Sequence, residues 1–258
     1  SVLTLSKPPS FRPLGSAGLQ GKDRKSMAGL DELLREFYIE ADVAGLWTKY
    51  APELRRINEA YRPFAEMALN DIIRYCRLDH NFFQKITESF RFNICPLMSH
   101  FTAWTAETDE EFYIISGPSD RSPGPGAFYH EALHHAINPL TAAYISQVST
   151  LNELLPLAQE QLKGNYPEWE DVVNECFVRA IDHVLSGKHY WWSPDQIRQR
   201  IENEYKNGFI LCPSIYEQLA DYEKSGDSFE CFFPRLISAI EIKKEQLNWQ
   251  SYWNSQAK

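Results

Sequence analysis

The sequence lacks three features that would place it in particular classes of protein: long apolar runs, an excess of basic residues and paired cysteines. It contains no apolar run of about 18 residues or more, which argues against a transmembrane segment. The formal net charge of −9 argues against nucleic acid as a partner, because phosphate binding needs a basic surface. The five cysteines are widely spaced and form no Cys-x-x-Cys pair, so neither a structural zinc site nor a dense disulfide framework is expected.

What is present is the composition of an ordinary globular protein, with 43% hydrophobic and 24% charged residues. Free, buried thiols are the default expectation for its cysteines, and one disulfide stays open. The chain starts at Ser1 rather than Met. A chain from which a signal peptide was removed, as in a secreted or periplasmic protein, would begin in the same way as a chain that was trimmed for another reason. The sequence therefore leaves the compartment open.

The chain is expected to form one domain behind an irregular leader. Residues 1–26 are rich in Ser, Pro, Gly and Lys and show no periodicity, which predicts an extended or disordered segment. The length of the remainder, 27–258, suits a single domain with a substantial core. This domain divides into a part of mixed helices and strands to about residue 140 and a helical part from about residue 141.

Periodicity predicts the elements of the mixed part. Apolar residues at helical spacing indicate a helix from Leu30 to Trp47 and a second helix from Pro52 to about Arg77, interrupted or kinked near Pro63. Two β-rich segments, Ser89–Cys95 and Glu111–Ser116, indicate a pair of antiparallel strands.

The helical part is predicted from start and stop signals. Asn138-Pro139 is expected to end the helix before it, and Gly187 to follow the end of another. The expected helices after residue 139 are Leu140–Leu162, Pro167–Ser186, Ser193–Asn207, Pro213–Lys224 and Phe229–Trp249.

One short segment carries the chemistry of a metal site. His130-Glu131-Ala132-Leu133-His134 is a complete His-Glu-x-x-His motif. Residues four apart share a helix face, so both imidazoles can converge on one ion, with Glu131 beside them. The alternative is two ordinary polar histidines on a half-buried helix. The apolar residues around them argue against it, because burying two imidazoles and a carboxylate is costly unless something satisfies them.

The segment resembles the active-site helix of the zincin metallopeptidases. No Gly-x-x-His follows His134, so the longer metzincin form is absent. The remaining common arrangement is that of the gluzincins, whose third zinc ligand is a Glu on a later helix. The ending His135-Ala136-Ile137-Asn138-Pro139 is also similar to that of bacterial zincin-like families. The resemblance implies an α+β, mostly helical, zincin-like fold in which a small β-sheet packs on the active-site helix, followed by a helical C-terminal part.

The resemblance also implies a zinc-dependent metallopeptidase with Zn²⁺ as its cofactor and a peptide or protein as its substrate. Three protein ligands leave an open position on zinc for a water, whose pKa then falls to near neutrality. In this interpretation Glu131 activates the metal-bound water that attacks the peptide bond and then protonates the leaving amine.

Glu175 is the favoured third ligand. It follows His134 by 41 residues and sits in the middle of a predicted helix between apolar residues. A carboxylate in such a setting usually has a partner, which is either a metal or an arginine. The competing interpretation is a salt bridge from Glu175 to Arg179, one turn further along the helix.

The supporting residues are less well defined. In the best-known gluzincin pattern a carboxylate one turn after the ligand Glu orients a ligand His, but Arg179 stands there in this chain. Asp182, on the same face as Glu175, could take that role, or it could be a surface residue near the helix end. A zincin also needs a donor for the oxyanion of the reaction, usually a His or Tyr. The residues available for this are His183, His189, Tyr190 and Tyr205.

Two other functions stay open. One is an inactive zincin-like domain that serves as a binding or interaction module, although the intact Glu131 counts against it. The other is a zinc hydrolase that acts on a non-peptide bond.

Overall fold

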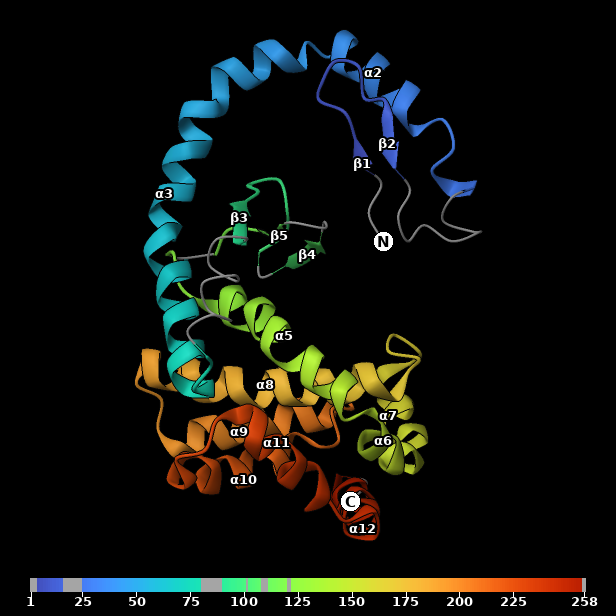
Figure 1. Cartoon of the computed structure of the whole chain (residues 1–258), viewed down its shortest axis with the longest axis vertical. Coiled ribbons are helices and arrows are strands. Elements are labelled where there is room, and N and C mark those ends of the chain that lie inside the picture. Colours follow the sequence, from blue (N-terminus) through green and yellow to red (C-terminus); the bar gives the residue numbers. More distant parts are fainter. Residues whose placement is uncertain are drawn as a thin grey trace. The chain divides into compact units, whose positions relative to one another are not determined.

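The structure is a computed structural model, which describes residues 4–15, 25–79, 90–100, 102–107, 111–119 and 122–256 (Figure 1). Within these ranges the protein is mostly helical and carries a small three-stranded sheet, which confirms the mostly helical α+β class. The helices in the same ranges are each too short or too polar to cross a membrane. Parts of the predicted leader, at residues 1–3 and 16–24, lie outside the described residues.

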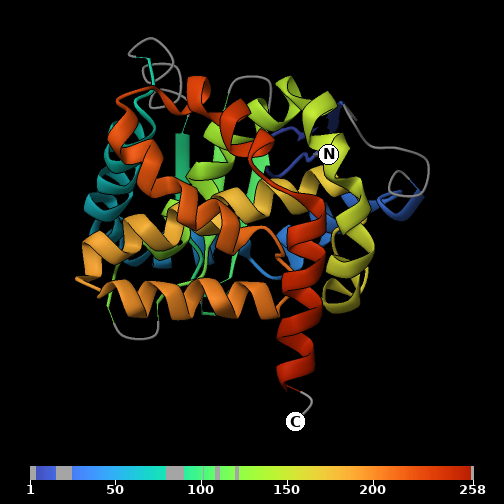
Figure 2. The ribbon, with the colours of Figure 1, turned by 90° about the horizontal axis from the view of Figure 1, so that it is seen from below.

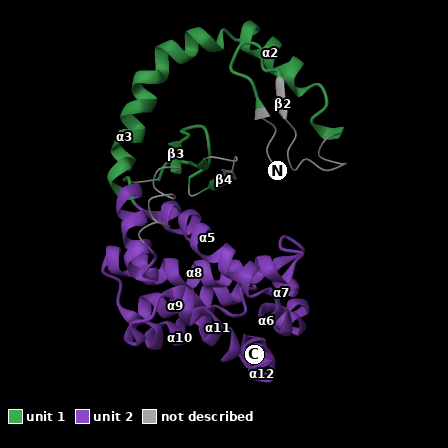
Figure 3. Ribbon diagram, in the orientation of Figure 1, with its two compact units in different colours: residues 1–64, 85–124 green, residues 65–84, 125–258 purple. Residues whose placement is uncertain are grey.

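The chain divides into two compact units (Figure 3). Unit 1 consists of residues 1–64 and 85–124, and unit 2 consists of residues 65–84 and 125–258. Unit 1 contains the strands, whereas unit 2 contains the His-Glu-x-x-His segment and the helices that follow it. All the side chains predicted to bind a metal therefore belong to unit 2.

In unit 1, β1 (Thr4–Leu5) pairs antiparallel with β2 (Pro13–Gly15) inside the predicted leader. Two helices, α2 (Leu30–Glu40) and α3 (Val43–Cys76), follow, and the residues of α3 from 65 onward belong to unit 2. The predicted boundary between these helices near Pro52 was wrong. The break lies at Asp42, which adopts a left-handed φ of 45° and accepts a 3.1 Å hydrogen bond from the Gly45 N–H. An aspartate in this position caps the start of a helix.

Pro52 and Pro63 lie inside α3, although a proline in a helix removes one intrahelical hydrogen bond and crowds the carbonyl four residues before it. The three-stranded sheet of unit 1 has the order β3-β5-β4. Its strands are β3 (Phe90–Ile94), β4 (Ala103–Glu107) and β5 (Phe112–Ser116).

The predicted antiparallel pairing of the two β-rich segments was also wrong, since β3 and β5 run parallel. The reason is β4, which the sequence analysis missed. β4 pairs antiparallel with β5, so the chain reverses once more before it enters β5. The sequence of β4, Ala-Trp-Thr-Ala-Glu, shows little of the apolar alternation that marks a strand.

Unit 2 is built around one central helix. Its helices are α5 (Gly126–Ala143), α6 (Ile145–Val148), the 3₁₀ helix η1 (Ser149–Leu154), α7 (Leu155–Leu162), α8 (Trp169–Tyr190), α9 (Pro194–Lys206), α10 (Cys212–Ser225), α11 (Phe229–Ser238) and α12 (Ile242–Gln256). α8 contacts α5, α9 and α10 (Figure 2). Most of the residues of α8 are buried, as expected for a helix that other helices cover on several sides.

Several predicted helix ends in unit 2 need correction. Pro139 lies inside α5, which continues to Ala143, because buried Ile137 and Thr141 hold both sides of the proline in the core. Gly187 lies inside α8, and a Cβ at this position would come within 2.6 Å of Ile197 on α9. This glycine therefore permits close helix packing, whereas the helix ends at Trp191, which has a left-handed φ of 58°.

Two long predicted helices are divided. The segment Leu140–Leu162 forms the end of α5 followed by α6, η1 and α7, and the segment Phe229–Trp249 is split into α11 and α12. The second break has no Gly or Pro signal, and buried Ile240 lies within it. By contrast, the predicted start of α9 is confirmed, because Ser193 and Gln196 form a capping box there.

The five cysteines are all free thiols. Cys76, Cys176 and Cys212 are buried, as expected for free thiols in a globular protein, whereas Cys231 is exposed. No disulfide joins any of them, so unit 2 depends on helix packing for its stability.

Candidate metal centre

The His-Glu-x-x-His segment lies on α5, as its spacing predicts. The apolar side of this helix is buried and packs against α8 (Figure 1). The buried residues of α5 are Phe128, Tyr129, Ala132, Leu133, Ala136, Ile137 and Thr141. His130 and His134 are one turn apart at the margin of this buried face, and their side chains are about one-fifth exposed.

The structure brings Glu175 of α8 to both histidines. One carboxylate oxygen, Oε1, lies 3.4 Å from Nε2 of His134, and the other, Oε2, lies 3.7 Å from Nε2 of His130. The two imidazole rings are 5.0 Å apart between centroids and are nearly perpendicular, with an interplanar angle of 80°. Glu175 itself is 8% exposed, so this carboxylate is removed from bulk water.

These distances are compatible with three ligands around one metal ion. In protein sites zinc binds nitrogen and oxygen at about 2.0–2.2 Å, and two ligand atoms on a tetrahedral ion are then about 3.3–3.6 Å apart. The separation of 3.4 Å lies within this range and the separation of 3.7 Å slightly above it. One donor atom from each of the three residues lies within 4.8 Å of the others, so small side-chain rotations can bring all three onto one ion.

The electrostatics of the cluster suit a cation. Burial lowers the pKa of His130 to about 4, which keeps this imidazole neutral at pH 7 with a lone pair to offer. Burial raises the pKa of Glu175, but the hydrogen bond from His134 and the charge of Arg179 outweigh it and lower the pKa to about 2. The Glu175 carboxylate is therefore ionised throughout the physiological pH range, and the neighbouring His134 partly balances its negative charge.

His134 also has a partner on its other nitrogen that the sequence analysis did not assign. Nδ1 of His134 lies 3.2 Å from the Oδ1 amide oxygen of Asn138, one turn further along α5. An Nδ1–H that donates to this oxygen would leave Nε2 free to bind a metal once Nε2 no longer donates its proton to Glu175. The spacing of four residues between His134 and Asn138 was a signal that could have identified this contact.

Glu131 belongs to the same electrostatic environment. Burial raises the pKa of its carboxyl group, and the charge of Glu175 adds to the effect against the opposing charges of His134 and Arg179. A carboxylate whose pKa is raised toward neutrality is a better proton acceptor at physiological pH than an ordinary glutamate.

The competing partner of Glu175, Arg179, is present at the same time. Nε of Arg179 donates a 2.9 Å hydrogen bond to Oε2 of Glu175, and Nη1 donates a 3.1 Å bond to Oε2 of Glu204 on α9. The guanidinium also lies 4.0 Å from the centre of the Phe209 ring. The salt bridge and the cluster with the histidines therefore exist side by side. Oε2 of Glu175 accepts the bond from Arg179 and also lies 3.7 Å from Nε2 of His130, whereas Oε1 faces Nε2 of His134.

The weaker sequence predictions have other neighbours. Asp182 accepts a 2.7 Å hydrogen bond from Ser186, and burial raises its pKa. His183 Nε2 lies 2.9 Å from Glu204, so it reaches the cluster only through Glu204 and Arg179. Tyr190 lies at the end of α8 with its ring stacked 5.5 Å from Trp192.

The two remaining donors considered for the oxyanion are engaged elsewhere. The ring of His189 packs against the adjacent Tyr190 ring at 4.5 Å. The ring of Tyr205 packs against Trp249 at 5.0 Å and against Tyr252 at 5.3 Å. Neither contact connects these residues to the histidines of α5.

Tyr166 is a functional candidate that sequence reasoning missed. It precedes α8, is partly buried, and has its ring 5.7 Å from that of Phe209. Burial raises its pKa, and the negative charges of Glu175 and Glu131 act in the same direction, while the positive charge of Arg179 opposes them. No sequence pattern distinguishes Tyr166 from the other tyrosines.

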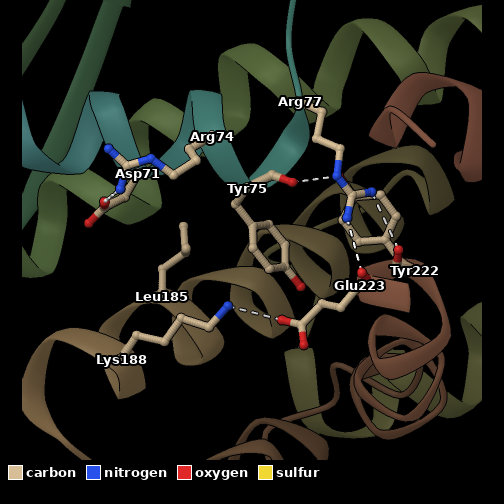
Figure 4. A pocket seen from close by; sticks show the side chains of 8 residues that line it. All are labelled: Asp71, Arg74, Tyr75, Arg77, Leu185, Lys188, Tyr222 and Glu223. Carbon is tan, nitrogen blue, oxygen red and sulfur yellow. Dashed lines mark hydrogen bonds and ion pairs between the residues drawn. The ribbon is translucent and has the colours of Figure 1, made fainter. Parts of the chain in front are cut away.

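Unit 2 also has a pocket of about 470 Å³ at the ends of α3, α8 and α10 (Figure 4). Its cationic groups are used within the protein. Arg77 donates to the main-chain carbonyls of Tyr222 and Glu223, at 3.4 and 3.1 Å, and Lys188 pairs with the Glu223 carboxylate at 3.0 Å. These contacts tie α3 and α8 to the end of α10, which is a structural role.

Comparison with known families places the cluster inside a matched region. Residues 126–239 match a domain of unknown function (DUF4932). The matched region begins at the first residue of α5 and ends just after α11, so it includes His130, His134, Glu175, Arg179 and Glu204. Neither a curated protein nor a solved structure matches the chain.

Proposed function

We propose that the protein is a zinc-dependent metallopeptidase with a zincin-like active site, and that His130, His134 and Glu175 hold the ion. The observation that carries the proposal is the convergence of two imidazole nitrogens and a buried carboxylate at 3.4 and 3.7 Å, with Glu131 next to the first histidine. When bound, zinc would lower the pKa of a coordinated water and polarise a substrate carbonyl.

The side chains of the protein would handle the protons of the reaction. Glu131 accepts the proton of the attacking water and returns it to the leaving amine, for which its raised pKa is suited. Tyr166 donates a hydrogen bond to the carbonyl oxygen as negative charge develops on it. Asn138 holds His134 in the tautomer that offers Nε2 to the ion.

A specific observation favours a second candidate, a metal-free binding domain. Arg179 already neutralises Glu175 through a 2.9 Å hydrogen bond, and a buried carboxylate with such a partner needs no ion. The two candidates, a zinc peptidase and a metal-free binding domain, differ in whether His130, His134 and Glu175 together bind a metal ion.

Metal content decides between these candidates. Elemental analysis should find about one zinc per chain in the wild-type protein, and loss of the zinc in His134→Ala and Glu175→Ala. Glu170→Ala is the matched control, because Glu170 lies in the first turn of α8 with its charge favourable to the helix N-terminus. A wild-type protein that holds no zinc after zinc is added would refute the proposal and leave the metal-free domain.

The reaction is tested with a library of peptides and with Glu131→Gln as the matched variant. This substitution keeps the size and polarity of the side chain but removes the proton acceptor, so it should retain zinc and lose peptide cleavage by about 100-fold or more. Zinc binding without cleavage of any peptide would exclude the peptidase and direct the search to non-peptide substrates.

A further inference from the structure

The helix face that supplies Glu175 continues into a row of polar side chains. Glu175, Arg179 and His183 stand four residues apart along α8 and so lie on one side of it. Glu204 of α9 meets this row, with Oε2 3.1 Å from Nη1 of Arg179 and Oε1 2.9 Å from Nε2 of His183. All four side chains are at most 24% exposed, so the row is largely shielded from solvent.

The row holds the guanidinium of Arg179 in place from several directions. Glu204 accepts its Nη1–H, and the Phe209 ring lies 4.0 Å from its Cζ. Glu204 is in turn held by His183. A planar guanidinium with fixed donors can orient a carboxylate, whereas a freely moving side chain cannot.

The two oxygens of Glu175 are consequently in different environments. Oε2 accepts the 2.9 Å bond from Arg179 and lies 3.7 Å from Nε2 of His130. Oε1 lies closer to a histidine, 3.4 Å from Nε2 of His134, and accepts no bond from the arginine. We propose that Arg179, anchored by Glu204, is a positioning residue that occupies one oxygen of Glu175 and presents the other to the metal ion. This proposal rests on the metal site of the proposed function.

A positioning role and a purely electrostatic role of Arg179 predict opposite changes in metal affinity when the arginine is removed. A positive guanidinium close to a divalent cation repels it, so its removal should tighten metal binding if Arg179 acts only through its charge. If Arg179 positions Glu175, its removal frees the carboxylate to rotate, and binding should weaken. Loss of a residue that orients a metal ligand typically weakens metal affinity by about 10–100-fold.

The experiment measures zinc affinity by competition with a chelator for the full chain and four variants. Arg179→Met removes the hydrogen-bond donors and the charge. Arg179→Lys keeps the positive charge but not the planar arrangement of N–H donors of the guanidinium. Glu204→Gln keeps Arg179 and loosens its anchor, and Arg198→Met removes an exposed ion pair with Asp195 on the same helix as Glu204. We expect weaker zinc binding by about 10–100-fold in Arg179→Met, an intermediate loss in Arg179→Lys and Glu204→Gln, and no change in Arg198→Met.

A spectroscopic readout separates positioning from loss of the fold. The cobalt-substituted wild-type protein should show the strong visible absorption of a four-coordinate ion. In Arg179→Met both oxygens of Glu175 are free to bind, so the coordination number should rise and the visible bands should weaken. Circular dichroism of each metal-free variant establishes that it is folded before its affinity is compared.

Each outcome bears on a different proposal. Zinc binding that is unchanged or tighter in both Arg179→Met and Glu204→Gln, with an unchanged cobalt spectrum, would overturn the positioning role and leave the metal site intact. A wild-type protein that binds neither ion would overturn the metal site itself, and the positioning role with it. If Arg179→Met does not fold, the affinity and spectrum of Glu204→Gln decide.

Discussion

Zinc should raise the thermal stability of the protein, because the ligand set exists only in the folded state. His134 and Glu175 are 41 residues apart in the chain, and the packing of α5 on α8 brings their donor atoms to 3.4 Å. A ligand that binds only the native state, at a free concentration of 100 times its Kd, raises the free energy of unfolding by about 2.7 kcal/mol. For a protein of this size each kcal/mol raises the Tm by about 2–4 °C, so the expected increase is about 5–10 °C.

Scanning calorimetry of the metal-free protein with and without zinc measures this shift. His134→Ala should abolish it, whereas Glu170→Ala should keep it, since Glu170 serves the start of α8. Cys231→Ser should also keep it, which controls for zinc bound by the exposed thiol. An equal shift in His134→Ala would show that zinc binds elsewhere, and the assignment of the three ligands would then be wrong.

Three further predictions concern the stability of unit 2, each measured by urea unfolding. Burial raises the pKa of Glu245, whose carboxylate accepts a 2.5 Å bond from Ser214, so the charged form destabilises the fold as the pH rises above the ordinary value of 4.5. Glu245→Gln should therefore be more stable than wild type at pH 7, by about 1.4 kcal/mol for each unit of pKa shift, and should lose this advantage near pH 3; equal stability at pH 7 would contradict it. Tyr129→Phe removes a 2.6 Å bond to Asp71, whose side chain is 31% exposed and keeps water, so the loss should be about 1–2 kcal/mol with zinc content unchanged. Phe233→Ala opens a cavity at a side chain with no exposed surface, so the free energy of unfolding should fall by about 3–5 kcal/mol. A much smaller decrease would mean that the aromatic residues around Phe233 move into the space.

The outcome for the helix boundaries shows where local signals suffice. The start of α9 was predicted because Ser193 and Gln196 form the whole capping device within four residues of sequence. Pro139 and Gly187 misled the prediction because their usual meaning as helix stops was overridden by tertiary packing. Pro139 is flanked by buried residues, and Gly187 makes room for Ile197 of another helix.

Strand pairing shows a second limit. The β-rich segments at β3 and β5 were recognisable, but their relative direction depends on β4, whose sequence carries little strand signal. A strand becomes a strand partly because a neighbour offers it hydrogen bonds, and that neighbour is not visible in its own residues.

The sequence by itself determined the local half of the candidate site. His130, Glu131 and His134 are placed together by the helical period alone, and the same period brings Asn138 to His134 and Arg179 to Glu175. Only the tertiary structure decided which later groups meet them. The packing of α5 on α8 selects Glu175, and the approach of α9 supplies the anchor for Arg179. These contacts join residues tens of positions apart, which burial and helix packing bring together and no short-range periodicity encodes.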